Sequence, residues 1–200
     1  AGRSHSETLL PLVRQLMDQA GLRFGDLDAI AFGAGPGAFT GLRVACAAAQ
    51  GLAVAAQLPL LAIGTLEAMA EASGAERVLV VLDARMNEVY WGAHVRGQGG
   101  WESLEPIAVG AADQVRLPSG TGWRTGGNAL TAYPALAARL TEAGLTVLSD
   151  LQPRAGAVAR LAARRWQRGD RDDPALAAPI YIRNKVAQTV AERLAAGGRA

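Results

Sequence analysis

The chain has 200 residues, of which 50% are hydrophobic and 19% are charged, a composition typical of a soluble globular protein that can bury a core. Its net charge at pH 7 is only +2, and its basic residues are spread out without interleaved aromatic residues, which argues against autonomous nucleic-acid binding. The single cysteine, Cys46, excludes an internal disulfide and favours a reducing compartment, so we expect a cytoplasmic protein.

The longest apolar region, residues 44–70, is dominated by alanine and is interrupted by polar residues, Pro59 and Gly64. A membrane-spanning helix needs about 20 strongly apolar residues, so we expect none here. The first residues contain no apolar signal segment and no initiating Met, and a helical pattern begins almost at once. We therefore interpret the sequence as beginning partway into a longer protein.

Helical and strand-like patterns alternate along the chain, which predicts an α/β fold. Capping-box spacing in Ser4–Glu7 opens the first helix, and Gly21 follows its last apolar position. In chain order, the predicted elements are a helix to residue 20, a strand at 29–32, a helix at 40–56, a strand at 59–63, a helix at 65–73, a hairpin of strands 77–83 and 89–95, strands and loops over 97–127, helices at 128–143 and 155–168, a strand at 180–182 and an amphipathic helix at 184–195.

A helix-rich section gives way to the hairpin near residues 70–76. We therefore predict an N-terminal lobe of residues 1–75 and a C-terminal lobe of residues 76–200, whose final helix could pack back on the first lobe.

The glycine-rich segment 33–53 is the most informative feature of the chain. It joins a predicted strand to a helix, which is a common way to bring backbone amides and a helix N-terminus to an anion. Gly35, Gly37 and Thr40 are therefore candidate nucleotide-binding residues. The glycine spacing matches neither a P-loop nor a dinucleotide fingerprint, so the alternative is a tight, closely packed turn.

Two other strand ends carry candidate ligand-binding residues. Asp83 could bind a metal or phosphate, or pair with Glu88, but the bulky Arg85-Met86 turn favours a turn-forming role. Gly126 and Gly127 precede a predicted helix and could approach a ligand's sugar or base, or simply form the entry to that helix.

The two histidines, His5 and His94, are far apart and neither belongs to a His-x-x-x-His pair. No Ser/His/Asp set can be assembled. We therefore predict no metal site, no catalytic residue and no tightly bound cofactor.

The first two predicted helices offer a partner interface. On the second, residues with little side-chain bulk recur at three- and four-residue spacing, which lets another helix approach closely. On the first, a longer apolar set follows the same helical spacing. The predicted interface residues are Gly41, Ala45, Ala48, Ala49 and Ala53 with Leu9, Leu12, Val13 and Leu16. The alternative is that the small face packs on the chain's own sheet.

Five blocks of this sequence resemble the bacterial TsaB (YeaZ) family. They occur in the expected order and span nearly the whole chain: His5-Ser6 with Leu9-Leu10-Pro11, Gly35-Pro-Gly-Ala-Phe-Thr-Gly-Leu-Arg43, Gln50-Gly-Leu-Ala53, Leu82-Asp-Ala-Arg-Met-Asn-Glu-Val-Tyr-Trp91 and Pro179-Ile-Tyr-Ile-Arg183.

The resemblance implies two ribonuclease-H-like lobes of the actin/Hsp70/sugar-kinase superfamily. It also implies a non-catalytic partner of the TsaD subunit, which acts with a TsaE-like ATPase and TsaC to make threonylcarbamoyladenosine in tRNAs that read ANN codons. From it we expect dimerisation with TsaD, homodimers when the chain is alone, contact with tRNA only through the complex, and the option of a nucleotide at the partner interface.

The chain departs from the family pattern at its start, where the family's strand hairpin with an Asp-Thr-Ser-type phosphate motif has no counterpart. We therefore expect a first lobe that lacks its opening strands. Two alternatives stay open: a glycoprotease-like metallopeptidase or small-molecule kinase of the same superfamily, and a homodimeric structural protein unconnected with tRNA.

Overall fold

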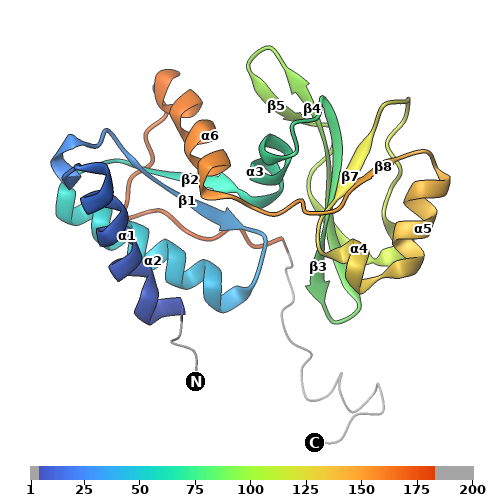
Figure 1. Cartoon of the computed structure of the whole chain (residues 1–200), viewed down its shortest axis with the longest axis horizontal. Helices are drawn as coiled ribbons and strands as arrows, with labels where there is room; N and C mark the ends of the chain where they lie inside the picture. The colour runs from blue at the N-terminus through green and yellow to red at the C-terminus, as the bar shows by residue number, and fades with distance from the viewer. Residues whose placement is uncertain (1–4, 183–200) are drawn as a thin grey trace, which may run out of the picture.

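The computed structural model describes residues 5–182, which form two α/β lobes side by side (Figure 1). The first lobe is built on a two-stranded parallel sheet of β1 (Ile30–Gly35) and β2 (Leu60–Gly64). Its helical elements are α1 (His5–Ala20), η1 (Phe24–Asp26), α2 (Phe39–Ala56) and α3 (Thr65–Ala72).

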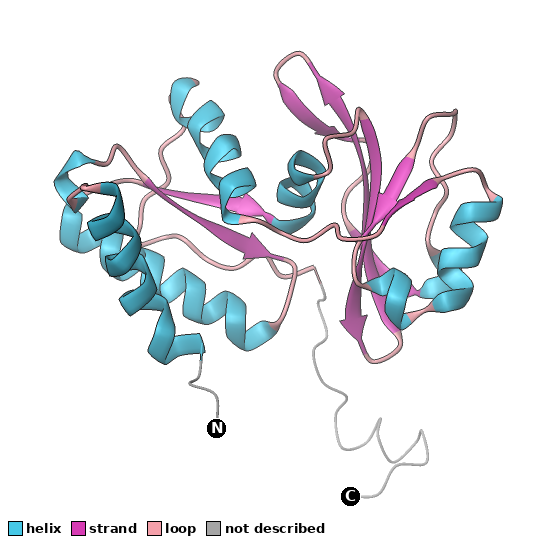
Figure 2. Ribbon diagram, viewed as in Figure 1, coloured by secondary structure: helices cyan, strands magenta, loops and turns pink. Residues whose placement is uncertain are grey.

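Neighbouring residues of these two strands face opposite sides of the sheet, and a helix covers each side. Leu60 packs with Phe32 under α2, whereas Leu61 and Ile63 pack under α6 (Ala155–Gln167). Figure 2 shows the same arrangement, with a helix on either side of the strands. This period of two follows from the pleat of the strands.

The second lobe contains a six-stranded sheet in the order β5-β4-β3-β7-β8, with β6 also pairing to β4. Its central strand β3 carries the run Val78–Val81, which is buried on both faces, as expected of a central strand. The elements are β3 (Arg77–Arg85), β4 (Glu88–Gly97), β5 (Gly100–Ser103), β6 (Ala108–Ala111), η2 (Ala112–Gln114), β7 (Arg124–Gly126), α4 (Ala129–Ala132), α5 (Pro134–Glu142) and β8 (Thr146–Leu148).

Helix α3 lies at the junction and packs on both lobes. Its Leu66 and Met69 join a core cluster with Val78 and Val80 of β3, while Ala68 packs with Leu161 of α6. The other face of the large sheet is covered by α4 and α5. The lobes are therefore joined through a shared helix as well as through the chain.

The two-lobed α/β class is confirmed, and three local predictions differ from the structure. The helix predicted over 128–143 is divided at Tyr133 (φ −129°, ψ 80°), because the residue before Pro134 is disfavoured in helical conformation. Residues 180–182 form no strand, although the Ile180 N–H donates to the Ala34 carbonyl at 2.8 Å. Helix α6 packs on the first lobe, although it lies within the range 76–200 assigned to the second. The predicted helix 184–195 lies outside the described residues.

Within residues 5–182, α2 is the one helix long and apolar enough to cross a membrane, judged by length and composition alone. Three of its residues, Cys46, Ala49 and Ala53, are buried against the β1–β2 sheet. Part of its apolar character therefore belongs to the core of the first lobe.

Candidate functional site

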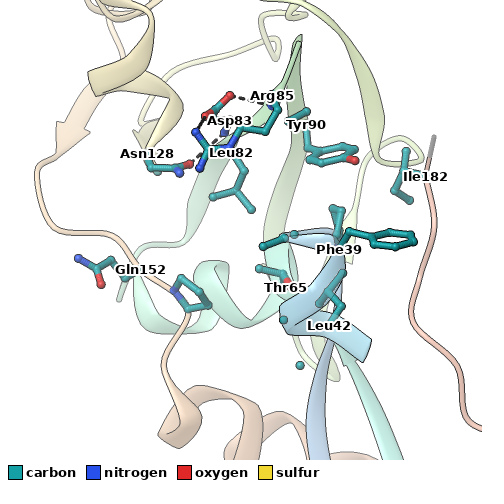
Figure 3. Close-up of a pocket in the computed structure, with 18 of the residues that line it drawn as sticks. Phe39, Leu42, Thr65, Leu82, Asp83, Arg85, Tyr90, Asn128, Gln152 and Ile182 are labelled. Atoms are coloured by element: carbon teal, nitrogen blue, oxygen red, sulfur yellow. Dashed lines mark hydrogen bonds and ion pairs between the residues drawn. The ribbon is translucent and has the colours of Figure 1, made fainter. Parts of the chain in front are cut away.

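A cleft of about 860 Å³ lies between the two lobes (Figure 3). The first lobe contributes the β1–α2 loop, the start of α3 and residues 180–182. The second contributes the β3–β4 turn, the turn before α4 and residues 149–153. Its lining includes Gly33, Pro36, Gly37, Phe39, Leu42, Thr65, Leu82, Asp83, Arg85, Met86, Tyr90, Gly127, Asn128, Gln152, Ile180 and Tyr181.

The β1–α2 loop is shaped by close packing around Gly35. This residue has φ +117°, and a Cβ there would lie 2.9 Å from Leu42 Cδ1 and 3.0 Å from the Ile180 carbonyl oxygen. Of the three candidates in this loop, Gly37 lines the cleft, whereas Gly35 is buried and Thr40 is exposed outside the lining. Gly35 is thus required by the packing of Leu42 and Ile180.

Asp83 is held within its own turn. Its carboxylate accepts the Arg85 backbone N–H at 2.8 Å and lies 3.2 Å from the Arg85 guanidinium. The Tyr133 hydroxyl donates to the same carboxylate at 3.3 Å, and burial, followed by the charge of Asp83, raises the pKa of Tyr133. The Asp83 carboxylate is thus engaged within the β3–β4 turn, on the wall of the cleft.

Gly126 and Gly127 are also required by packing. Gly127 has φ +128°, and a Cβ there would collide with the Val81 carbonyl. A Cβ on Gly126 would lie 2.7 Å from Leu151 Cβ. The next residue, Asn128, accepts the Asp83 backbone N–H at 2.9 Å through its side-chain oxygen, so this helix entry braces the end of β3.

No three His, Cys, Asp or Glu side chains among residues 5–182 are grouped as metal ligands. Asp150, on the cleft wall, pairs with Arg154 at 3.0 Å. His94 lies in β4 away from the cleft lining, where burial lowers its pKa to about 4 and its Nε2 has no hydrogen-bond partner.

Three exposed side chains at the mouth of the cleft escaped the sequence reasoning. The Arg43 guanidinium lies 3.6 Å from the centre of the Phe39 ring, and its Nε donates to the Tyr181 hydroxyl at 3.0 Å. The i, i+4 spacing of Phe39 and Arg43 was a signal that they share a helix face. Tyr181 is 138 residues farther along the chain, so no local pattern could have joined it to them.

The predicted interface residues divide between the surface and the core. Leu12 (52% exposed) and Leu16 (64%) of α1 face solvent, with the unpredicted Leu10 (50%), whereas Leu9 and Val13 are half-buried. On α2, Gly41 is exposed and Ala48 is half-buried.

The other three α2 residues of the predicted interface need a correction. Ala49 and Ala53 are buried with Phe32 and Leu60 in the core under α2, and Ala45 packs against the same cluster. Their small side chains let α2 approach the chain's own sheet, as the alternative interpretation expects.

Comparisons with known proteins give consistent matches. The family model "TsaD: tRNA N6-adenosine threonylcarbamoyltransferase" matches residues 1–128. The chain is 38% identical to the "tRNA threonylcarbamoyladenosine biosynthesis protein TsaB" of Escherichia coli, over 92% of this chain and 83% of that protein. It is 35% identical to the protein of the same name from Haemophilus influenzae, over 93% and 83%.

Solved structures agree. "YeaZ from Pseudomonas aeruginosa" superposes with a TM-score of 0.78 at 36% identity, over 90% of this chain and 86% of that chain. A second structure from the same organism, described as similar to peptidase YEAZ, gives a TM-score of 0.80 at 37% identity, over 90% and 85%.

Proposed function

The chain belongs to the TsaB family, and from this premise we propose that it is a non-catalytic binding subunit of the complex that adds threonylcarbamoyl to adenosine in tRNAs reading ANN codons. Its relatives carry the name of that biosynthesis. The observation that carries the binding role is the apolar face of α1, where the exposed Leu12 and Leu16 lie beside the half-buried Leu9 and Val13. A large apolar patch on a soluble protein typically marks an interaction site.

The proposed partner is a TsaD-family subunit, bound through α1 and the adjoining exposed part of α2. Gly41 and the half-buried Ala48 lie on α2, where little side-chain bulk lets a partner helix approach. Without that partner, the same face is proposed to form a homodimer. A TsaE-like ATPase joins the complex, tRNA meets this chain only through the complex, and the site of action is the cytoplasm.

The non-catalytic role is supported by the state of the cleft. Asp83 is committed to Arg85 and Tyr133, and the side chains of Arg85 and Met86 occupy the turn where a phosphate cradle normally needs glycine. We therefore propose that the chain alone holds no nucleotide tightly, and that any nucleotide is shared with the partner at their interface.

A glycoprotease-like metallopeptidase or a small-molecule kinase is not favoured. Either enzyme needs a set of metal ligands or free carboxylates at the reacting centre. The two acidic side chains on the described cleft wall, Asp83 and Asp150, are both paired with arginine.

The proposal is tested by deleting the gene and measuring tRNA nucleosides by mass spectrometry. Threonylcarbamoyladenosine should fall while other tRNA modifications stay at their normal level, and the intact gene should restore it. Unchanged threonylcarbamoyladenosine would contradict the proposed function. ATP hydrolysis or glycopeptide cleavage by the purified chain, abolished by Asp83→Ala, would contradict the non-catalytic role.

A further inference from the structure

An exposed aromatic and cationic cluster stands at the mouth of the cleft. It consists of Phe39, Arg43 and Tyr181, which we call the cleft-mouth cluster. Phe39 is 45% exposed and Tyr181 is 48% exposed, although their ring centres lie only 6.2 Å apart. Arg43 contacts both rings, so the three side chains are held in place before any partner arrives. Figure 3 shows Phe39 across the cavity from Asp83 and Arg85.

On the opposite wall of the cleft, Met86 lies in a tight turn whose backbone conformation disfavours methionine. Arg85 pairs with Glu88, so Met86 and Asn87 form a two-residue hairpin loop, and both have positive φ (54° and 61°). Such loops favour Asn and Gly, whereas a positive φ is energetically unfavourable for methionine. The Met86 side chain is also 68% exposed. Neither the turn geometry nor exposure to water favours methionine at this position, and such unfavoured residues cluster at functional sites.

The charges around the mouth are unbalanced toward positive. Among the described residues, Arg43 forms no ion pair with an acid. The side chain of Arg85 is 87% exposed even though it contacts Asp83. The two acids of the described wall, Asp83 and Asp150, are each neutralised by an arginine. A partner group that complements this mouth therefore carries negative charge beside an apolar or aromatic side chain.

We propose that the cleft mouth is a second contact area for the partner subunit, separate from the α1 face. It takes an acidic segment of that subunit, with a carboxylate on Arg43 and an aromatic or large aliphatic side chain between the cleft-mouth cluster and Met86. This inference rests on the proposed function, because it assumes that a partner subunit binds.

The composition of the two walls favours a protein segment over a nucleotide. Tyrosine, phenylalanine, methionine and arginine are the residues enriched at protein interfaces, and arginine and tyrosine dominate their hot spots. The bulk of Arg85 and Met86 in the turn leaves little room for a polyphosphate to reach the backbone. Met86 in turn suits the packing of an aromatic side chain through its polarisable sulfur.

The experiment measures binding of the full chain to the purified TsaD-family subunit of the same organism by biolayer interferometry. Arg43→Glu and Phe39→Ala should each weaken binding about tenfold or more. The matched control is Arg124→Glu, an exposed arginine of β7 outside the cleft lining, which should leave binding unchanged. Circular dichroism verifies that each variant is folded.

A photo-cross-linkable benzoylphenylalanine at position 86 then identifies the occupant. Cross-linking to a partner peptide with Asp or Glu near an aromatic or large aliphatic residue supports the proposal. Cross-linking to a second copy or to residues 183–200 of this chain overturns it, as does competition by ATP. Equal binding by both cleft-mouth variants and the unaltered chain overturns this inference alone. No binding by the unaltered chain overturns the proposed function and this inference with it.

Discussion

Arg164 Nη2 lies 2.7 Å from Glu71 Oε2, and this ion pair ties α6 to α3 at the junction of the lobes. The same carboxylate pairs with Arg160 at 3.0 Å and with Arg96 of β4 at 3.6 Å, and it accepts the Trp101 indole N–H of β5 at 2.9 Å. Figure 1 shows α6, α3 and β5 gathered on one side of the junction, with the β3–β4 turn on the other. One buried carboxylate therefore joins elements of both lobes.

Glu71→Gln should lower the free energy of unfolding by about 2–3 kcal/mol at pH 7, because it removes a buried charge that three arginines share. Urea denaturation measures the change. The matched control is Glu76→Gln: Glu76 also contacts Arg96, at 3.8 Å, but its side chain is 79% exposed, so the change should stay within about 0.5 kcal/mol. Equal losses in the two variants would contradict the structural role of Glu71.

The same carboxylate predicts a dependence of stability on acid. Burial alone would raise the pKa of Glu71, but hydrogen bonds from Arg164, Trp101 and Arg160 lower it from 4.5 to about 2. Because the pKa is lower in the folded than in the unfolded chain, Glu71 stabilises the fold at pH values above its unfolded-state pKa. This contribution is lost as the pH falls from 4.5 toward 2. The stability difference between Glu71→Gln and the unaltered chain should therefore shrink across this interval.

His94 predicts a second loss of stability on acidification, in a higher pH interval than that of Glu71. Burial lowers its pKa from 6.5 to about 4, so the unfolded chain binds a proton there before the folded chain does. Stability should therefore fall as the pH is lowered from 6.5 to 4. His94→Gln, which does not titrate, should flatten the dependence in this interval alone. A slope unchanged by that substitution would show that other groups cause it.

Gly127→Ala should destabilise the chain by about 2 kcal/mol or more, because the new Cβ meets the Val81 carbonyl and φ is +128°. Gly99→Ala is the control, since a Cβ at Gly99 has nothing within 4 Å, and its effect should stay within about 0.5 kcal/mol. Thermal denaturation compares them. Similar melting temperatures for the two variants would contradict the packing assigned to Gly127.

The sequence was sufficient where local pattern decides structure, as in the valine-rich run of β3 and the strand–loop–helix around Gly35. It was insufficient where tertiary packing decides. Spacing shows that the small face of α2 can be approached closely, but not that β1 and β2 occupy it at Ala49 and Ala53. Likewise, Tyr181 reaches Arg43 only because the chain returns to the first lobe with α6 and stays there up to residue 181.

One missed boundary was within reach of sequence reasoning. Pro134 disfavours helical conformation at Tyr133, so the division between α4 and α5 follows from a local rule that the apolar periodicity concealed. The short edge strand β8, in contrast, has two exposed residues among three and no alternating pattern to reveal it. It forms because β7 offers a pairing edge.

Met86→Asn should stabilise the isolated chain by about 0.5–1 kcal/mol, because asparagine tolerates the positive φ of the hairpin loop better than methionine does. The same change should weaken binding to the TsaD-family subunit if Met86 is a contact residue. Denaturation and biolayer interferometry on one preparation separate the two effects. A loss of stability on substitution would contradict the turn argument, whatever the effect on binding.

Leu16→Arg should abolish association through α1 while leaving the melting temperature unchanged. Leu16 is 64% exposed, so arginine does not disturb the core, but a charge buried without a partner at an interface opposes binding. Leu104→Arg is the control: Leu104 is 51% exposed on the second lobe and should tolerate the change without loss of binding. Ala49→Arg, in contrast, should unfold the chain, because Ala49 is buried between α2 and the β1–β2 sheet. Sedimentation measures the homodimer and biolayer interferometry measures binding to the TsaD-family subunit. Association of the Leu16 variant at the affinity of the unaltered chain would place the interface on another surface.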